Sequence, residues 1–204
     1  KYYHGLGVGD VNRDGRNDVV IVHGWWEAPA KLDGGQWAFH PLPLSKNNEG
    51  NPLPASNIHV IDLDLDGDSD LLTSSAHAYG IWWFENPGPG SDGAFQYHLI
   101  DESFSQTHAS GLVDLNNDGV PHLVTGKRYF AHMGPDPGEF DPVVMHTFEI
   151  RRSPGQPPTF VKHELVAGRD TGVGTQFQIG DFNRDGRLDV VLSNKKGVNV
   201  LTQE

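Results

Sequence analysis

Short apolar runs recur along the chain, and each follows an acidic turn that contains glycine. The four runs cover residues 19–22, 71–72, 123–124 and 190–192. Branched and aliphatic runs of this length, bounded by turn residues, are typical of β-strands. The many glycines (25) and prolines (14) also suit short strands joined by turns and disfavour long helices.

Further strand-like segments surround each run. One segment enters each turn, at residues 6–9, 58–61, 109–113 and 176–180. A third strand follows each run, at residues 24–27, 81–85, 144–149 and 198–201. A fourth follows in three repeats only, at residues 37–40, 95–98 and 160–163. The pattern predicts an all-β protein built from units of four antiparallel strands, the last unit lacking its outer strand.

The acidic turns share the spacing D-x-[DN]-x-D-G-x-x-D. Their first residues are Asp10, Asp62, Asp114 and Asp181, which lie 52, 52 and 67 residues apart. Oxygen ligands at alternate positions, followed by a glycine that permits a sharp reversal, suit a calcium ion better than magnesium. Positions one, three and five offer side-chain oxygens, position seven its backbone carbonyl and position nine a closing carboxylate.

The sequence therefore predicts a set of calcium ligands in each turn. In the first turn they are Asp10, Asn12, Asp14, Arg16 and Asp18. In the second they are Asp62, Asp64, Asp66, Asp68 and Asp70. In the third they are Asp114, Asn116, Asp118 and Val120. In the fourth they are Asp181, Asn183, Asp185, Arg187 and Asp189.

The third turn departs from the pattern because His122 occupies the closing position. Calcium prefers oxygen ligands, so we expect this turn to bind weakly or not at all and the chain to hold three to four structural ions. The alternatives are acidic turns without metal and EF-hands. An EF-hand needs glutamate at position twelve between helices, where this chain has Ile21, Thr73, Thr125 and Leu192.

Charge and composition narrow the class of protein. The formal net charge is −12, which argues against nucleic-acid partners and anionic membrane surfaces. Four bound calcium ions would reduce this charge to about −4, so folding is expected to depend on calcium. There is no cysteine, and no apolar run approaches a membrane span. The chain begins at Lys1, so we expect a mature or excised segment whose targeting peptide lies upstream.

The four turns and their strands resemble the FG-GAP/VCBS repeats, the calcium-loop blades also found in integrin α-subunits and some fungal lectins. The resemblance covers nearly the whole chain and implies a secreted, periplasmic or cell-surface β-propeller. The segments at residues 74–80 and 125–132 look like those of a bacterial subgroup of such proteins. Such propellers commonly have seven blades. Residues 1–204 are then four consecutive C-terminal blades, at about 4–41, 56–101, 108–166 and 175–204. The remaining blades would lie upstream or in another chain, and a four-bladed ring is the alternative.

A functional face is expected at the blade ends opposite the calcium loops. Three interpretations stay open: a hydrated rim, a binding site and an enzyme. A polar or anionic small molecule, a carbohydrate or a protein partner would be bound by His23, Trp25, Tyr79, Lys127, Arg128, His132 and Lys195. A metal-dependent lyase or dehydratase acting on carbohydrate would use His4, His77, His108, Lys127 or Arg128, with an additional transition metal on the histidines.

Two other features accompany this face. The turn-rich insertion at residues 133–142 follows Lys127, Arg128 and His132, and loops of this kind often carry function. Three histidines recur at one position of the outer strands, namely His40, His98 and His163. Their periodicity favours a role in blade packing or a bond to neighbouring backbone over a role as ligands.

Overall fold

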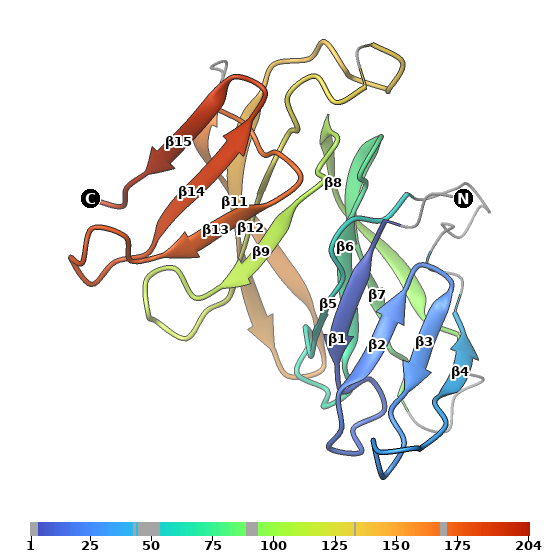
Figure 1. Cartoon of the computed structure of the whole chain (residues 1–204). Helices are drawn as coiled ribbons and strands as arrows, with labels where there is room; N and C mark the ends of the chain where they lie inside the picture. Colours follow the sequence, from blue (N-terminus) through green and yellow to red (C-terminus); the bar gives the residue numbers. More distant parts are fainter. Residues whose placement is uncertain (1–3, 43, 45–53, 89–93, 133, 168–170) are drawn as a thin grey trace. The chain divides into compact units, whose positions relative to one another are not determined.

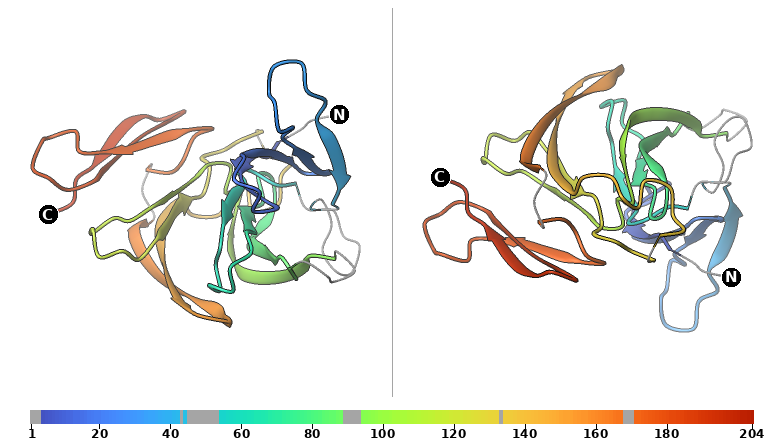
Figure 2. Two further views of the ribbon diagram at one scale, coloured as in Figure 1. Left: turned by 90° about the horizontal axis from the view of Figure 1, so that it is seen from below. Right: turned by 90° about the horizontal axis from the view of Figure 1, so that it is seen from above.

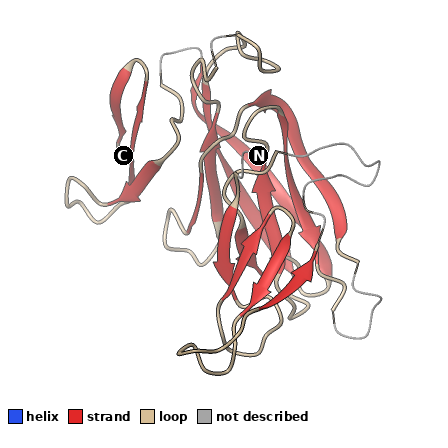
Figure 3. Ribbon diagram, turned by 45° about the vertical axis from the view of Figure 1, so that its right-hand side comes forward, coloured by secondary structure: helices blue, strands red, loops and turns tan. Residues whose placement is uncertain are grey.

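The computed structural model describes residues 4–42, 44, 54–88, 94–132, 134–167 and 171–204. These residues form β-strands and loops without any helix (Figure 3). They divide into two compact units. Unit 1 contains Lys1–Ser74, Ile81–Asp101 and Arg152–Pro157, and unit 2 contains Ser75–Gly80, Glu102–Arg151 and Pro158–Glu204.

Unit 1 is built on two antiparallel sheets. The first has the order β1 (Leu6–Gly9), β2 (Asp18–Ile21), β3 (Gly24–Glu27) and β4 (Ala38–Pro41). The second has the order β5 (His59–Ile61), β6 (Asp70–Ser74), β7 (Tyr79–Glu85) and β8 (Gln96–Ser105). One end of each of β7 and β8 belongs to unit 2. These ends are Tyr79, Gly80 and Glu102–Ser105. Each acidic turn joins the first two strands of its sheet (Figure 1).

The first strands of the two sheets in unit 1 lie side by side, as the blue and teal ribbons of Figure 2 show. Small residues allow this approach: a side chain at Gly7 would come 2.5 Å from the carbonyl oxygen of Ile58, and one at Gly9 would come 2.5 Å from Val60. Ile58 also donates its N–H to the carbonyl of Leu6 at 3.1 Å. The strand-to-strand packing therefore depends on glycine at alternate positions of β1.

The apolar core of unit 1 lies between these sheets. Its buried members come from both sheets: Val11, Val20, Leu42, Leu44, Ile58, Leu71, Trp82 and Phe84. Val20, Leu71 and Trp82 have no exposed surface. Full burial of such side chains stabilises the fold by about 1.5–3 kcal/mol each. The apolar runs after the first two acidic turns thus supply the core, as their sequence pattern predicts.

Unit 2 contains the other two sheets. The third has the order β12 (Gln156–Ala167), β11 (Val144–Ser153), β10 (His122–Gly126) and β9 (Ser110–Val113). The fourth has three strands among the described residues: β13 (Phe177–Gly180), β14 (Asp189–Asn194) and β15 (Gly197–Leu201). The core of this unit is formed by Ala109, Val124, Met145, Val173, Val190 and Leu192.

The prediction of an all-β fold with four-stranded antiparallel sheets is confirmed. The outer strands differ in length from the prediction, since β8 has ten residues and β12 has twelve. A tight turn at Gly155, with φ of +63°, joins β11 directly to β12 and lets both strands extend as a ribbon. The sequence predicts the parts of these two strands at residues 144–149 and 160–163, whereas the tip between them, residues 151–159, has no apolar run and carries no strand signal.

The tip of the β11–β12 ribbon counts with unit 1 and contacts the second acidic turn. Arg152 donates from Nη1 to the carbonyl of Asp62 at 3.2 Å, and Gly155 donates its N–H to the carbonyl of Asp64 at 2.8 Å. Two carbonyls in the turn of β5–β6 therefore have partners outside that hairpin. The second turn is the one whose backbone the rest of unit 1 supports most directly.

His59 on β5 makes the stability of unit 1 sensitive to pH. Burial lowers the pKa of His59 to about 4, from an ordinary value of 6.5. Between pH 6.5 and pH 4 the imidazole is therefore protonated in the unfolded chain but neutral in the folded chain. The free energy of unfolding consequently falls as the pH drops from 6.5 towards 4. We expect the parent to lose at most about 3 kcal/mol of unfolding free energy over this pH range, and the variant His59→Asn not to show this loss. Urea unfolding at each pH measures both. Equal pH dependence in both proteins would contradict this assignment.

No helix in the part of the chain that the structure describes is both long and apolar enough to span a bilayer.

Candidate functional site

The four acidic turns share one backbone conformation. Six described residues other than glycine have positive φ, and four of them occupy the fourth position of a turn: Arg13, Leu65, Asn117 and Arg184. The glycine two residues later is also left-handed, with φ between +84° and +102°. Two left-handed residues in six curl the chain so that alternate side chains point inward. The glycine was predictable, but the left-handed fourth position carried no residue signature.

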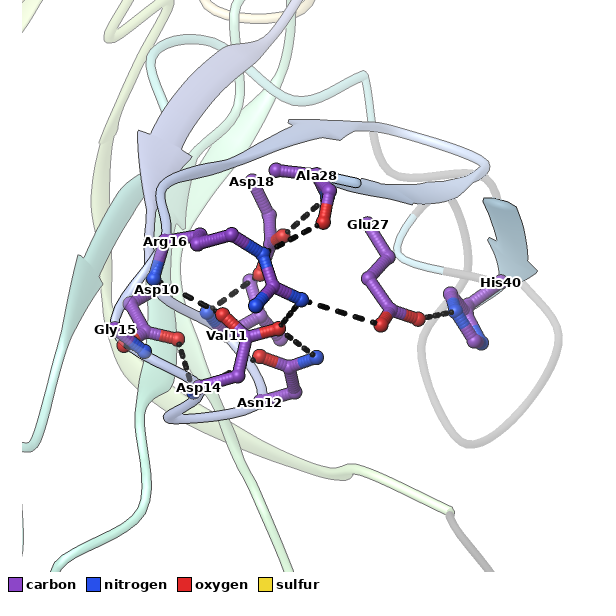
Figure 4. A network of polar contacts seen from close by, with 10 residues as sticks. All are labelled: Asp10, Val11, Asn12, Asp14, Gly15, Arg16, Asp18, Glu27, Ala28 and His40. Carbon is purple, nitrogen blue, oxygen red and sulfur yellow. Dashed lines mark hydrogen bonds and ion pairs between the residues drawn. The ribbon is translucent and has the colours of Figure 1, made fainter. Parts of the chain in front are cut away.

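Figure 4 shows how the first turn is arranged. Asp10 accepts the N–H groups of Asp14 and Gly15 at 3.0 and 2.8 Å, and Asp14 accepts that of Arg16 at 2.9 Å. The Arg16 guanidinium is paired with Asp14 and lies 3.9 Å from Glu27. The backbone thus places the carboxylates of positions one and five on the same side of the turn. The fourth turn repeats this geometry from Asp181 to Arg187.

The closing aspartates at position nine hold each turn to its own sheet. Asp18 has no exposed surface, and its two oxygens accept the N–H groups of Val11 and Ala28, both at 2.9 Å. Asp70 accepts those of Leu63 and Asn86, both at 2.8 Å. Asp189 does the same for Phe182 and Gln203, at 3.2 and 3.3 Å. Each closing carboxylate therefore joins the start of its turn to the end of the third strand.

The second turn has the features of a cation site. Side-chain oxygens of Asp62, Asp64 and Asp70 lie within 4.8 Å of one another, and buried Oδ1 of Asp62 has no hydrogen-bond partner. Two oxygens on opposite sides of a calcium ion would be about 4.8 Å apart, since the calcium–oxygen distance is about 2.4 Å. The donor set and its spacing therefore fit calcium.

The electrostatics of the second turn also favour a bound cation. Burial raises the pKa of Asp70 to about 7. Burial also raises the pKa of Asp64, to which the neighbouring charges of Asp66, Glu85 and Asp62 add. Burial and neighbouring negative charges disfavour the ionised form of each carboxylate. A bound cation would stabilise the ionised forms, because its positive charge offsets the repulsion between them.

The third turn is closed in a different way. Asp114 and Asp118 keep the turn bonds, since Asp114 accepts from Gly119 at 2.8 Å and Asp118 from Val120 at 2.8 Å. His122 is buried and its Nδ1 lies 3.0 Å from the carbonyl oxygen of Val120. Its ring therefore turns to the backbone carbonyl that the sequence assigned to calcium as position seven. Weaker calcium binding by the third turn stays a prediction.

A pocket of about 570 Å³ opens beside the first two turns of unit 1. Its walls include Asn12 and Arg13 from the first turn and Asp68 from the second. The Arg13 guanidinium reaches the second turn, because a side chain at Gly67 would lie 2.6 Å from its Nη1. Trp25, His40 and Phe95 supply aromatic walls. Pockets of this volume, with aromatic walls and a few polar groups, are typical of small-molecule sites.

The recurring histidines of the outer strands bind side chains rather than backbone. His40 Nε2 lies 2.7 Å from Glu27, and His98 Nε2 lies 2.7 Å from Glu85. Their rings stack on Trp25 and Trp83, with centroids 4.2 and 4.5 Å apart. In the third sheet His163 lies 3.6 Å from Glu149. The prediction of a packing role holds, but the glutamate partner was missed because it lies across the strand pair.

In unit 2, backbone bonds at Gln106 join three loops. The N–H of Gln106 donates to the carbonyl of Ala78 at 2.8 Å, and its carbonyl accepts the N–H groups of His108 and Arg128 at 2.8 and 3.0 Å. Gln106 has φ of +58°, a left-handed conformation that is unfavourable for this residue type. Its side chain donates to Glu139 at 3.1 Å. The loops after β6, β8 and β10 are therefore tied together at one buried residue.

Lys127 is fully buried in unit 2, and its Nζ has no hydrogen-bond partner among the described residues. Burial lowers the pKa of Lys127, although the carboxylates of Glu139, Asp141 and Asp136 act against this shift. The sequence predicted that Lys127 would offer its charge to an anionic ligand. The structure buries this side chain completely, and three carboxylates of the insertion after β10 act electrostatically on its ammonium group.

Two histidines in unit 2 share one carboxylate oxygen. His132 Nδ1 lies 2.6 Å and His77 Nδ1 lies 3.3 Å from Oδ2 of Asp136. The two rings are nearly parallel, with centroids 4.7 Å apart. His77 also meets His108 edge-on at 5.6 Å. The insertion at residues 133–142 thus contributes Asp136, which sequence reasoning missed, while Met133 lies outside the described residues.

The other predicted site residues fall in two groups. His4, His23 and Trp25 belong to unit 1, where His23 is exposed in the turn between β2 and β3. Tyr79, Arg128 and Lys195 belong to unit 2 with His77 and His108. Tyr79 donates its hydroxyl to Asp141 at 2.5 Å, and Lys195 donates to the carbonyls of Phe130 and Ala131 at 2.8 and 3.1 Å. Both residues are therefore engaged by neighbouring loops of unit 2.

Comparison with protein families agrees with the strand pattern and the acidic turns. Residues 31–125 match the family model of the FG-GAP-like repeat. The match covers the second acidic turn with its sheet, and the third turn with β9 and most of β10. Together with the four-stranded antiparallel sheets, it indicates a β-propeller-like domain. Comparison with curated proteins gave no match.

Proposed function

We propose that the chain is a calcium-stabilised, extracytoplasmic β-propeller domain that binds a polar small molecule or carbohydrate, the ligand lying beside its calcium loops. Calcium binding rests on the second turn, where Oδ1 of Asp62 is buried without a partner amid the oxygens of Asp64 and Asp70. No hydrogen-bond donor of the described chain satisfies this oxygen. A bound divalent cation would supply the missing interaction and offset the crowded charge.

The pocket beside the first two turns is the observation that carries the ligand-binding part of the proposal. Two of its polar walls, Asn12 and Asp68, are themselves predicted calcium-loop residues. An ion that fixes these turns also fixes the pocket, so ligand binding should require calcium. Trp25 and Phe95 offer apolar faces and Arg13 offers donors, a mixture that suits a sugar or another polar ligand.

The same chemistry supports a location outside the cytoplasm. Calcium modules of extracellular proteins bind with dissociation constants of about 10⁻⁴–10⁻³ M, and the largely exposed first and fourth turns suit that weak range. A secreted, periplasmic or cell-surface location supplies such concentrations. A protein partner on the loops of unit 2 is compatible with this location as well.

A test of the binding function compares two adjacent tryptophans on β3. Trp25 lines the pocket, whereas Trp26 contacts Phe39 with tilted rings and is 39% exposed. Trp25→Ala should weaken retention on an oligosaccharide array at least about tenfold, which corresponds to about 1.4 kcal/mol of lost contact. Trp26→Ala should bind as the parent does, and the parent should release the array in a calcium chelator.

Trp25→Phe serves as a milder variant, because Trp25 also packs against the core. Circular dichroism checks that all variants are folded. Equal retention by the Trp25 and Trp26 variants would contradict the pocket assignment.

A second candidate function is a metal-dependent lyase or dehydratase acting on carbohydrate. The carboxylate shared by His77 and His132 favours it, since a histidine oriented by an acidic group can act as a general base. Incubation with the retained oligosaccharide separates the two functions. Mass spectrometry that finds products lighter by water or cleaved by elimination supports the enzyme, and unchanged oligosaccharide supports the binding module.

A further inference from the structure

We infer that His77, His132 and Asp136 form a binding site for a divalent transition-metal ion, separate from the calcium loops. This inference does not depend on the proposed function, because all three residues lie in unit 2 and none belongs to an acidic turn. One ligand atom from each residue lies within 4.8 Å of the other two. Imidazole nitrogens with one carboxylate favour zinc or iron over calcium.

The distances suit such an ion. Two ligands bound tetrahedrally at about 2.1 Å lie about 3.4 Å apart. Nδ1 of His77 and Oδ2 of Asp136 are 3.3 Å apart, so this pair already has the separation of two ligands on one tetrahedral ion. Nδ1 of His132 and the same oxygen are 2.6 Å apart, which is a hydrogen bond. Metal binding would displace the shared proton and open this pair by less than about 1 Å.

The surroundings of the three residues support the ligands and admit an ion. Glu139 is buried and accepts the backbone N–H of His132 at 3.3 Å and the side chain of Gln106 at 3.1 Å. Glu139 in turn donates its own N–H to the carbonyl of Asp136 at 3.1 Å. This carboxylate thus fixes the segment that carries two of the three ligands. The side chain of His132 is 43% exposed, which leaves a path from solvent.

Formal charge favours a divalent ion. Asp136, Glu139 and Asp141 carry three negative charges, and all three act electrostatically on the single positive charge of Lys127. The four groups together have a formal charge of −2 in a partly buried region. A divalent cation bound by Asp136 and two neutral imidazoles would bring this charge to zero.

The test is zinc binding to the whole chain in excess calcium. Protein is equilibrated with zinc, freed of unbound metal in calcium-containing buffer and analysed for both metals. We expect one zinc per chain in the parent, and none in His77→Gln or His132→Gln at equimolar zinc. His163→Gln is the matched control, because His163 is an exposed histidine of the same unit that also faces a glutamate. It should retain the zinc of the parent.

Two further measurements separate a built site from adventitious binding. Glu139→Gln should weaken zinc by about 10–100-fold in competition with a chromophoric chelator, as loss of a supporting hydrogen bond does in other metal sites. Cobalt in place of zinc should give the visible absorption of a tetrahedral complex, which His132→Gln abolishes. Circular dichroism in calcium establishes that each variant is folded.

No stoichiometric zinc in the folded parent, or equal zinc in the parent and both ligand variants, would overturn the inference. Either result leaves calcium stoichiometry and oligosaccharide retention unaffected. Failure of the calcium loops would instead appear as a loss of bound calcium with zinc unchanged.

Discussion

Removal of calcium is expected to lower the melting temperature of this chain by about 15–30 °C. The reason is that the ions bind only the folded turns. In calcium at about a hundred times the dissociation constant, each site adds about 2.7 kcal/mol to the free energy of unfolding. Three occupied turns add about 8 kcal/mol, comparable with the whole stability of a typical domain. For a chain of this size each kcal/mol shifts the melting temperature by about 2–4 °C.

Differential scanning calorimetry in calcium and in a calcium-selective chelator measures this effect. Magnesium should restore little of the lost stability, because its octahedral geometry and short bonds suit these flexible turns poorly. Native mass spectrometry from calcium-containing solution should count three bound calcium ions, and His122→Asp should raise the count to four by restoring a closing carboxylate. An unchanged melting temperature in the chelator would contradict the calcium assignment of the turns.

Asp70→Ala is expected to be strongly destabilising for a substitution of a single acidic residue in unit 1. Asp70 is buried, and its two oxygens accept the N–H groups of Leu63 and Asn86. Alanine would leave two backbone donors without partners, at about 1–3 kcal/mol each, and would also remove a calcium ligand. The two donors alone cost about 2–6 kcal/mol, and weakened calcium binding adds to this loss in calcium-containing buffer.

Chemical denaturation of Asp70→Ala beside Asp33→Ala measures this loss. Asp33 is an exposed aspartate in the loop between β3 and β4, so its replacement should change stability by less than about 0.5 kcal/mol. The chelator should narrow the difference between Asp70→Ala and the parent, because part of the loss is lost metal affinity. If Asp70→Ala and Asp33→Ala were equally stable, the closing role of Asp70 would be wrong.

The turns and strands were readable from the sequence because their chemistry fixes the spacing of residues. A cation loop needs oxygens at alternate positions, and a strand that packs on one face needs apolar residues nearby. Asp70 followed by Leu71 and Leu72 satisfies both demands within three residues. Contacts between residues close in sequence require such spacings of polar and apolar residues. The strand order within each sheet could therefore be predicted.

The arrangement around Lys127 could not be read in the same way. Lys127 is fully buried, and Asp136, Glu139 and Asp141 of the insertion lie within electrostatic reach of it. The sequence displays three acidic residues in a turn-rich loop, but nothing local says which way the loop folds. The pairing of His40 with Glu27 was hidden for a related reason. These residues are 13 apart in sequence, and their contact depends on the register between β3 and β4.

The backbone bonds at Gln106 bear on the thermodynamics of ligand binding in unit 2. They hold the loop that carries His77 and the loop that carries His132 to a common point through Ala78 and Arg128. Loops that were free to move independently would lose conformational entropy when a ligand bridged them, and affinity would suffer accordingly. Here that entropy is lost when the chain folds. Binding to these loops should therefore carry a small entropic penalty, with the left-handed strain at Gln106 as the energetic cost of preorganisation.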